Sequence, residues 1–508
     1  MANAPQTTVS ASALPAYLRN ASPVPLDKRA PWYLNTAPTY AGIFLWFAFY
    51  QPLGSALLEG TLLSVLIGIV LAGAICHFFF YYVPGMLGMR TGLPLYIVGT
   101  STFGVTGGYF IPGIFMGLLQ IGWYSVATYF ATRLVLGGIG LPVEGAYFYI
   151  LAPIWGFIFA LVGALGIGYV ARIAQFFPIV PIIMLIIGAI QAAPYLGNYQ
   201  PPPASGGHSF DTDLLSAGTL LVIQMIVGFF GTAGAVGADF CSNNRNSEDV
   251  QYAGLAGIWG AIIFAAGLAV LTVAGAHGYN PDLRNLQVVK DGKLVTEKKW
   301  DEMSRGEKDQ RMTYETALKA LNTTVAEDGT VQENLLARGM LLLFAIGSMA
   351  PACFCSFIIG NSLSTMLGMP KSRIPITLAG AAAGIIIALT GLPANLAPIF
   401  GLVGASFGPV IGAMIADYFL NGANWPGPRE GINWAGYGAW LVGFLIGISN
   451  NGMISGALGF ELVPAWHPTG VYSLVAGFVV YIVLARLIGL PARLEGAVQV
   501  VDPEPRKA

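Results

Sequence analysis

The side chains that could bind a ligand lie inside long apolar runs of the chain. Gln120 and Trp123 are three residues apart in GIFMGLLQIGWYSVATYF, so they share one face of a helix. An indole offers a broad stacking surface and a carboxamide offers a paired donor and acceptor, which together suit a flat heterocycle. Packing between helices is the alternative role for both residues, because such side chains in apolar helices commonly contact a neighbouring helix.

Two further polar side chains stand in the middle of apolar runs. Gln51 precedes Pro52 in WFAFYQPLGSALLEG and either holds two helices together or contacts a ligand. The Ser348 hydroxyl either donates to the carbonyl four residues earlier or helps to bind an ion. The first role is the more common one, and Pro351 raises the second slightly, because it removes the backbone donor that would occupy the carbonyl of Gly347.

The few carboxylates near these runs lie at their ends. Asp239 and Asp417 each close an apolar run, and Glu59 ends the first one. Carboxylates inside a membrane are functional candidates. At the ends of helices they are expected to cap a neighbouring helix or to pair with Arg245 or Arg429. We therefore expect no proton relay in the core.

Composition indicates that membrane-spanning helices position these side chains. Of the 508 residues, 55% are hydrophobic and 10% are charged, against about 25% charged in soluble domains. The net charge of −1 gives no basic surface for nucleic acid, and no phosphate-binding P-loop indicates an ATP-driven pump. The four cysteines form no C-x-x-C pair and are interpreted as small hydrophobic residues.

Apolar runs between Pro and Gly clusters predict about twelve spans. They are 38–58, 61–83, 105–132, 145–168, 174–193, 214–240, 253–276, 336–362, 374–391, 394–420, 433–452 and 470–490. Lys and Arg gather in the loops on the side of the N-terminus, and only Arg133 lies in or beside a short loop on the other side. The positive-inside rule therefore predicts a multi-pass protein of the plasma or inner membrane with both termini cytoplasmic.

Two of the spans carry residues that interrupt helices. Pro52 and Gly54 predict a break near Gln51–Gly54 in the first span. In the sixth span, glycines recur every third residue from Gly228 to Gly237, which predicts a break at mid-membrane. Two broken spans at corresponding positions of two halves are typical of secondary transporters with a binding site between them. Close packing of small residues against a neighbouring helix is the alternative for the glycines.

The charged segment 278–335 lies between spans seven and eight. VVKDGKLV (Val288–Val295) predicts a hairpin that turns at Asp291–Gly292, and Lys308–Leu321 predicts a short helix. We interpret the segment as a small outer domain. Of its two candidate roles, solvated decoration is favoured over a lid above the binding site.

Three motifs resemble those of the nucleobase:cation symporter-1 family. STFGVTGGYF (Ser101–Phe110), followed by QIGW (Gln120–Trp123), resembles that family's SFG-x-x-G…GW pattern. FGPVIGAMIADYFL (Phe407–Leu420) is similar to its span-ten signature, and GADF (Gly237–Phe240) to the end of its sixth span. The resemblance covers spans one to twelve and leaves out the charged segment.

The resemblance implies an all-α polytopic fold of two inverted five-helix repeats, LeuT-like, with broken first and sixth spans and two further helices. The boundaries expected are 1–36 for a cytoplasmic tail, 37–193 for the first repeat, 213–421 for the second repeat with its 278–335 insertion, 432–491 for the last two spans and 492–508 for a cytoplasmic tail. It also implies import of nucleobases or related heterocycles, driven by Na⁺ or H⁺.

Carried across position by position, the resemblance implies roles for particular residues. Trp123 matches a tryptophan that stacks on substrate, and Phe230, beside Gly231, falls where an aromatic residue is common. The implied Na⁺ contacts are Ala345, Ser348 and first-span carbonyls near Phe47 and Tyr50.

The chain also departs from the family pattern. Ala127 and Phe354 stand where polar residues are expected, Met349 replaces a Thr of the Na⁺ site, and Thr102 replaces an Arg. These departures predict a more apolar pocket and leave the coupling ion open between Na⁺ and H⁺. Phe354 is still expected to contact the substrate, as are Phe230 and Gly231.

The sequence as a whole predicts a transporter rather than an enzyme, with no cofactor beyond the coupling cation. Its partners would be a small planar heterocycle of the cytosine, purine, uracil, allantoin or hydantoin type and the lipid bilayer. Trp123 and Phe230 would sandwich the ring, and Gln51 and Gln120 would supply polar contacts. The alternatives are a same-fold symporter for amino acids or other organic solutes, and a membrane sensor or structural subunit.

Overall fold

The computed structural model describes residues 6–7, 14–165, 179–202, 214–290, 293–325, 331–333, 335–460, 463–494 and 496–504. Within these residues, ten helices are long and apolar enough to cross a membrane. A bent pair, α2 (Thr36–Phe44) with Phe47–Leu58, makes an eleventh span, and the shorter apolar helix α22 (Trp434–Gly447) makes a twelfth. The number of spans is therefore the one predicted from the apolar runs.

The first half of the bundle contains five spans. After α2 come α3 (Phe47–Tyr50) and the 3-10 helix Leu53–Leu58, then α4 (Leu62–Ile75) continuous with α5 (Tyr82–Thr91), α8 (Phe115–Ile139), α9 (Ala146–Leu165) and α11 (Ile179–Ala192). The short helices α1 (Ala16–Arg19), α6 (Leu95–Val98) and α7 (Thr100–Phe103) lie between or before them.

The second half contains the remaining seven spans. They are built from α12 (Ala217–Ala235) with α13 (Gly237–Cys241), α14 (Ser247–Gly254) continuous with α15 (Ala261–Tyr279), α18 (Leu335–Gly347) with α19 (Met349–Met366), α20 (Arg373–Leu389), α21 (Leu396–Leu420), α22 and α24 (Thr469–Leu487). The short helix α23 (Gly452–Leu458) lies between α22 and α24. Helices predominate because only they satisfy all backbone groups of a single span inside lipid.

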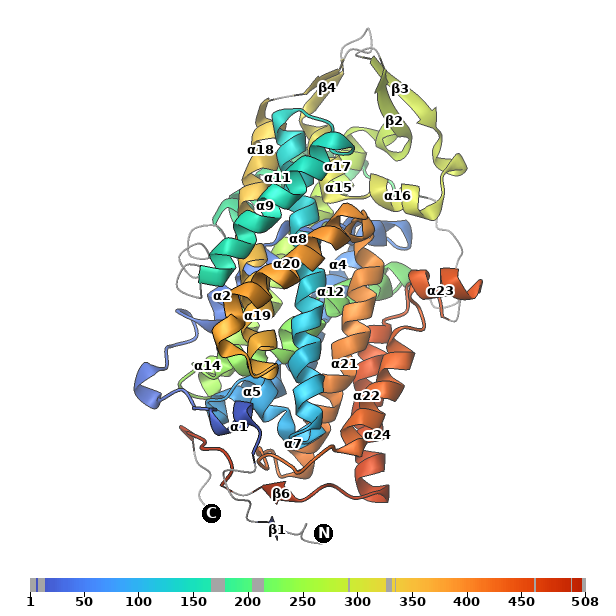
Figure 1. The fold of residues 1–508 in the computed structure, drawn as a ribbon. Helices are drawn as coiled ribbons and strands as arrows, with labels where there is room; N and C mark the ends of the chain where they lie inside the picture. Colours follow the sequence, from blue (N-terminus) through green and yellow to red (C-terminus); the bar gives the residue numbers. More distant parts are fainter. Residues whose placement is uncertain are drawn as a thin grey trace.

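The two ends of the chain meet at one end of the bundle (Figure 1). Strand β1 (Gln6–Thr7) pairs in parallel with β6 (Arg493–Leu494). The buried guanidinium of Arg29 donates to the carbonyls of Met89 at 2.6 Å and Val501 at 2.7 Å. The segment before the first span is thus packed onto the bundle, and both termini lie on one side of it, as the charge distribution requires.

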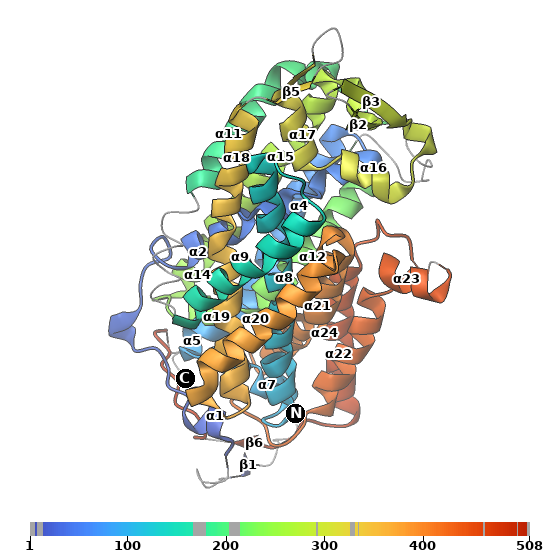
Figure 2. The same ribbon diagram turned by 45° about the horizontal axis from the view of Figure 1, so that its top comes forward.

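The charged segment forms a cap over the opposite end, which we call the outer end (Figures 1 and 2). The predicted hairpin is confirmed, since β2 (Leu286–Lys290) pairs antiparallel with β3 (Lys293–Lys298); its turn at Asp291–Gly292 lies outside the described residues. The predicted single helix is instead α16 (Arg305–Arg311) and α17 (Tyr314–Leu321), separated because the Thr313 hydroxyl caps α17. A second strand pair, β4 (Thr323–Val325) with β5 (Val331–Glu333), closes the cap.

The first span breaks earlier than its proline predicts. The chain bends by 53° between α2 and α3, and Trp46 has an extended backbone with φ −71° and ψ 130°. At Pro52 the helix only changes to the 3-10 form. The expected break near Gln51–Gly54 is therefore corrected to Leu45–Trp46, which holds no proline and where the Trp46 ring packs against those of Trp123 and Phe229.

The sixth span is helical through most of its glycines. Helix α12 runs unbroken to Ala235, and the interruption is confined to Val236, before α13 begins. A Cβ at Gly228 would lie 2.5 Å from the Phe400 carbonyl oxygen, and one at Gly231 would lie 3.0 Å from that of Val403. These glycines let α21 approach closely, which is the packing role that small residues have in membrane helices.

Candidate functional site

A cavity of about 160 Å³ lies beside the break in the first span. It is lined by residues of α2, α8, α11, α12 and the eighth span, namely Pro38, Thr39, Gly42, Ile43, Leu45, Trp46, Gln120, Trp123, Pro181, Phe229, Thr232, Ala233, Val236, Gly347, Ala350, Pro351, Phe354, Cys355 and Ile358. Pro38 is exposed and Thr39 is half-buried, so this inner cavity reaches the surface beside the N-terminal part of α2. Its volume is close to that of a cavity of about 150 Å³ that admits benzene.

Three of the predicted ligand residues line the inner cavity together. Gln120, Trp123 and Phe354 come from α8 and α19, which pack side by side. The Trp123 indole donates to the Thr232 hydroxyl at 3.1 Å, which fixes the orientation of the ring. The Gln120 amide nitrogen lies 3.7 Å from the Met116 sulfur, a weak acceptor, so its stronger hydrogen-bonding capacity remains for a ligand.

The aromatic residue of α12 that faces the inner cavity is Phe229 rather than Phe230. Its ring centroid lies 5.1 Å from that of Trp123. Phe230 is fully buried elsewhere, where it stacks on Phe44 with centroids 5.5 Å apart. Gly231 lies against α21. Trp123 and Phe229 meet edge-on, with an interplanar angle of 71°, so they form one aromatic wall of the inner cavity, and the expected sandwich of Trp123 and Phe230 is not present.

The spacing along α12 could have identified this face. Phe229, Thr232, Ala233 and Val236 recur at intervals of three and four residues and all line the inner cavity. Such spacing places residues on one face of a helix. The resemblance to the family implied the neighbouring residue, Phe230, instead.

Gln51 lies outside the inner cavity. Its side chain accepts from the backbone N–H of Glu315 at 2.9 Å, and its carbonyl accepts from that of Tyr314 at 3.1 Å. It lines a second space of about 320 Å³ at the outer end, which we call the outer chamber. The outer chamber is lined by Gln51, Pro52, Ser55, Tyr129, Phe130, Arg133, Glu144, Gly306, Asp309, Gln310, Thr313, Glu315, Ala394, Asn395, Leu396, Ala397 and Pro398.

Trp46 is a cavity residue that sequence reasoning missed. It lies at the break itself, with its ring centroid 5.7 Å from that of Trp123. Its indole N–H is buried and has no hydrogen-bond partner within the described part of the chain. A buried donor without a partner costs free energy, which an acceptor on a ligand would recover. No helix-breaking residue stands at positions 45 and 46, so the sequence offered no signal for this residue.

The residues implied for Na⁺ lie between the first and eighth spans. Phe47 of α3 contacts Phe344 of α18 with ring centroids 5.4 Å apart, which brings the two spans together. The Ser348 hydroxyl donates to the Phe344 carbonyl at 3.0 Å, and the Phe47 carbonyl accepts from the backbone of Gln51 at 3.1 Å. The serine thus makes the bond four residues back that the sequence left as one alternative. Ala345 can offer only its backbone oxygen, and the buried Tyr50 hydroxyl has no hydrogen-bond partner among the described residues, so the Na⁺ assignment stays a prediction.

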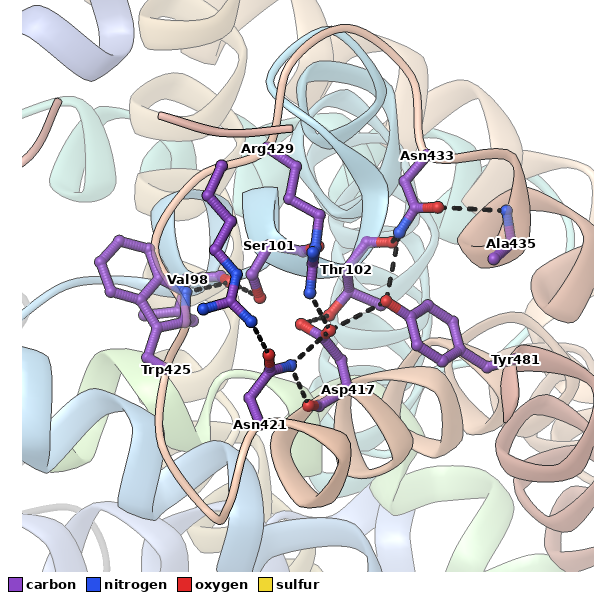
Figure 3. A network of polar contacts seen from close by, with 11 residues as sticks. Val98, Ser101, Thr102, Asp417, Asn421, Trp425, Arg429, Asn433, Ala435 and Tyr481 are labelled. Atoms are coloured by element: carbon purple, nitrogen blue, oxygen red, sulfur yellow. Dashed lines mark hydrogen bonds and ion pairs between the residues drawn. The ribbon is translucent and has the colours of Figure 1, made fainter. Parts of the chain in front are cut away.

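Asp417 is engaged in a buried polar network near the end of α21 (Figure 3). Its carboxylate accepts from Arg429 at 2.8 Å, Tyr481 at 2.9 Å and Asn421 at 3.1 Å. The ion pair is almost fully buried, with 1% and 2% of the two side chains exposed. The expected pairing with Arg429 is confirmed. Because its oxygens are already bonded, this carboxylate holds helix ends together rather than facing the inner cavity.

Asp239 also has a structural role, because it caps the start of α6. Its carboxylate accepts from the backbone N–H of Leu95, the first residue of α6, at 3.1 Å. Arg245, the expected alternative partner, instead pairs with Asp249 at 2.8 Å. None of the three carboxylates predicted at the ends of spans, Asp239, Asp417 and Glu59, lines the inner cavity.

Comparisons with known proteins give a partial match in sequence. No family model matches the chain. It is 27% identical over 222 residues to the cytosine permease of Escherichia coli (strain K12), an alignment that covers 42% of this chain and 46% of the permease. The chain thus spans about half the length of the curated relatives that it matches.

Comparisons of structure cover nearly the whole chain. Mhp1, a nucleobase-cation-symport-1 family transporter, solved in a closed conformation with bromovinylhydantoin bound, matches with a TM-score of 0.60 at 16% identity, over 94% of this chain and 97% of its own. A Na⁺-coupled sialic acid symporter matches with a TM-score of 0.52 at 13% identity, over 92% of both chains. The LeuT-like fold and the resemblance to the nucleobase:cation symporter-1 family are both confirmed. The proteins matched are permeases and symporters, not enzymes.

Proposed function

We propose that this multi-pass membrane protein is a secondary active transporter that imports a planar, nucleobase-like heterocycle by alternating access. One observation carries the proposal: the inner cavity lies at the break of the first span and is lined by the aromatic rings of Trp46, Trp123 and Phe229. Base–aromatic stacking contributes about 1–3 kcal/mol per base, which is enough to select flat rings. The cytosine permease and Mhp1 support the same substrate class.

The size and wall of the inner cavity narrow the substrate. Its volume of about 160 Å³ suits a single ring of the cytosine, uracil or hydantoin kind better than a fused purine. No charged side chain of the described residues lines it. Amino acids and acidic solutes, the rival substrates on this fold, would bring charges that such a wall does not neutralise.

The polar contacts follow from the donors and acceptors at the wall. The Gln120 carboxamide provides a donor and an acceptor, and the free Trp46 indole N–H provides a donor for a ring carbonyl. Phe354 replaces the polar residue expected there, so affinity depends more on stacking than in the family pattern. The coupling ion, Na⁺ or H⁺, acts as a co-substrate, with Ser348, Ala345 and carbonyls near the break as its proposed contacts.

Transport requires that bound substrate change the balance between states. A ligand with equal affinity for both states shifts nothing, so the ring must bind most tightly when the cavity is closed around it. The two halves of the first span, joined at Leu45–Trp46, provide the bend that lets α2 move relative to α3.

A thermal-shift panel on the purified protein tests the proposal. Cytosine, uracil, hydantoin, adenine and neutral amino acids are each added with and without Na⁺ and at two pH values. Single-ring heterocycles are expected to raise the melting temperature, because a ligand that binds only the folded state stabilises it. Uptake of the best ligand into proteoliposomes then separates a transporter from a sensor. Stabilisation by amino acids alone would contradict the proposal.

A further inference from the structure

The cap over the outer end is inserted into the bundle rather than resting on it. Tyr314, the first residue of α17, is fully buried. Its ring meets that of Tyr50 edge-on with centroids 5.2 Å apart, and those of Phe344 and Phe47 at 5.8 Å and 6.4 Å. The solvated decoration favoured from the sequence is therefore wrong for α17, which contacts the part of the first span beyond its break.

Backbone N–H groups of the cap also form hydrogen bonds with the first span. The first two N–H groups of α17 donate to the Gln51 carbonyl and side chain. These are helix-terminal donors that have no partner within their own helix. Arg305 of α16 forms an ion pair with Glu59 at the far end of the same span. A Cβ at Gly54 would overlap the Met312 carbonyl oxygen, so the two backbones lie in direct contact.

An aromatic layer separates the outer chamber from the inner cavity. Phe47 contacts Phe130 and Phe344 with centroids 6.0 Å and 5.4 Å apart, and Tyr50 and Tyr314 complete the layer. Phe130 and Gln51 line the chamber above it, and Trp46 and Trp123 line the cavity below it. The layer thus lies between residues that line the outer chamber and residues that line the inner cavity.

We propose that the cap supplies the outer gate of the transport pathway, with Tyr314 as the positioning residue that holds α3 and the 3-10 helix Leu53–Leu58 closed over the inner cavity. This inference rests on the proposed function, and it concerns a segment that the family resemblance does not cover. Opening to the outer end requires Tyr314 to leave the layer. If it leaves the layer, its contacts with Tyr50, Phe344 and Phe47 are lost, so in this proposal they bias the equilibrium towards closure.

Labelling of one cysteine tests the gate without knowledge of the substrate. Cys355 lines the inner cavity and is buried, and the other three cysteines, Cys76, Cys241 and Cys353, are changed to alanine. A membrane-impermeant thiol reagent is added to sealed vesicles in which the cap is accessible to protease. The reagent can then reach Cys355 only through the outer gate.

The Tyr314→Ala variant is expected to raise the labelling rate at least about tenfold, since each factor of ten in the open population needs only about 1.4 kcal/mol. Tyr314→Phe keeps the ring and should keep the slow rate, because the hydroxyl makes only a 3.4 Å contact with the Met184 carbonyl. Tyr147→Ala is the matched control, since it removes an aromatic ring that is 49% exposed near the start of α9.

A milder variant keeps the test valid if Tyr314→Ala does not fold. Arg305→Gln removes the ion pair with Glu59 from a side chain that is 44% exposed, and it should raise the rate about threefold, as an exposed pair of well under 1 kcal/mol permits. An unchanged rate in the folded variants overturns the gate, as does an equal rise in Tyr147→Ala. Faster labelling without any heterocycle binding would support the gate while refuting the proposed function.

Discussion

The two internal spaces of the protein differ in the chemistry of their walls. The inner cavity of about 160 Å³ is lined by apolar and aromatic side chains with a few neutral polar groups. The outer chamber of about 320 Å³ is lined by the charged residues Arg133, Glu144, Asp309 and Glu315. A single layer of aromatic rings around Phe47 separates them.

The difference follows from the elements that build each wall. Spans surrounded by other spans form the inner cavity, where an unpaired charge would be too costly to bury. The outer chamber is lined by the cap, the loop after α8 and parts of the first span, α8 and the start of α21. Its charged residues are paired, Arg133 with Glu144 at 3.1 Å, Glu315 with Lys319 at 2.7 Å and Asp309 with Arg305 at 3.0 Å. The apolar inner cavity is thus suited to binding a planar ring, and the charged outer chamber is suited to holding the cap against the bundle.

Removal of the stacking surface of the inner cavity is expected to have the largest effect on ligand binding. Trp123→Ala should weaken ligand binding roughly 5- to 150-fold, because base–aromatic stacking contributes about 1–3 kcal/mol, and should abolish saturable uptake at low substrate concentration. Uptake kinetics and calorimetric binding measure the effect. Elution as a single folded species is the control. Unchanged uptake would remove Trp123 from the site.

The two glutamines provide a matched pair, one in each space. Gln120→Ala should weaken heterocycle binding by about 2- to 12-fold, the loss of one net hydrogen bond of about 0.5–1.5 kcal/mol. Gln51→Ala should leave equilibrium binding in detergent within about twofold, because its side chain is bonded to the cap. The reverse order of affinities would show that Gln51 and not Gln120 contacts the substrate.

The apolar wall itself can be altered at Phe354. Phe354→Asn places a carboxamide at the inner cavity and should shift preference by about 2- to 12-fold towards rings with more donors and acceptors, again the range of one net hydrogen bond. Competition of cytosine against an N-methylated analogue measures the change. Phe354→Leu keeps the wall apolar and should leave the preference as it is. An identical shift in both variants would indicate altered packing only.

The smallest effect expected is a dependence of the cap on pH. The Lys298 ammonium, with help from the Ser304 donors, lowers the pKa of Glu307 from 4.5 to about 2. A carboxylate with a lowered pKa stabilises the folded state above its unfolded value and loses that contribution as the pH falls. Protease cleavage of the cap should therefore speed up slightly between pH 4.5 and pH 2 in the wild type and much less in Glu307→Gln. Equal acceleration in both proteins would contradict this assignment.

Much of the architecture was predictable from the sequence. The apolar runs predicted the spans, and the Asp291–Gly292 turn motif within Val288–Val295 predicted the hairpin, because both depend on local composition. The pairing of Asp417 with Arg429 was also predictable, since a carboxylate at membrane depth needs a partner and few cations lie near it. Gln120 and Trp123 were placed together for the equally local reason that they are three residues apart on one helix.

The points at which the first and sixth spans are interrupted depended on contacts between helices. The proline at 52 and the glycines of the sixth span are the residues that interrupt isolated helices, yet the first span bends at Leu45–Trp46 and the sixth only at Val236. Gly228 and Gly231 are used for close approach of α21, and Trp46 leaves the helix to pack on Trp123.

The sequence by itself determined which segments enter the membrane, because burying some twenty apolar residues needs no partner to be favourable. Only the tertiary structure decided that Phe229 rather than Phe230 faces the inner cavity, and that Tyr314 of the cap reaches into the bundle. Rotation of a helix by one residue, and docking of a loop onto a distant span, depend on packing against elements far away in the chain.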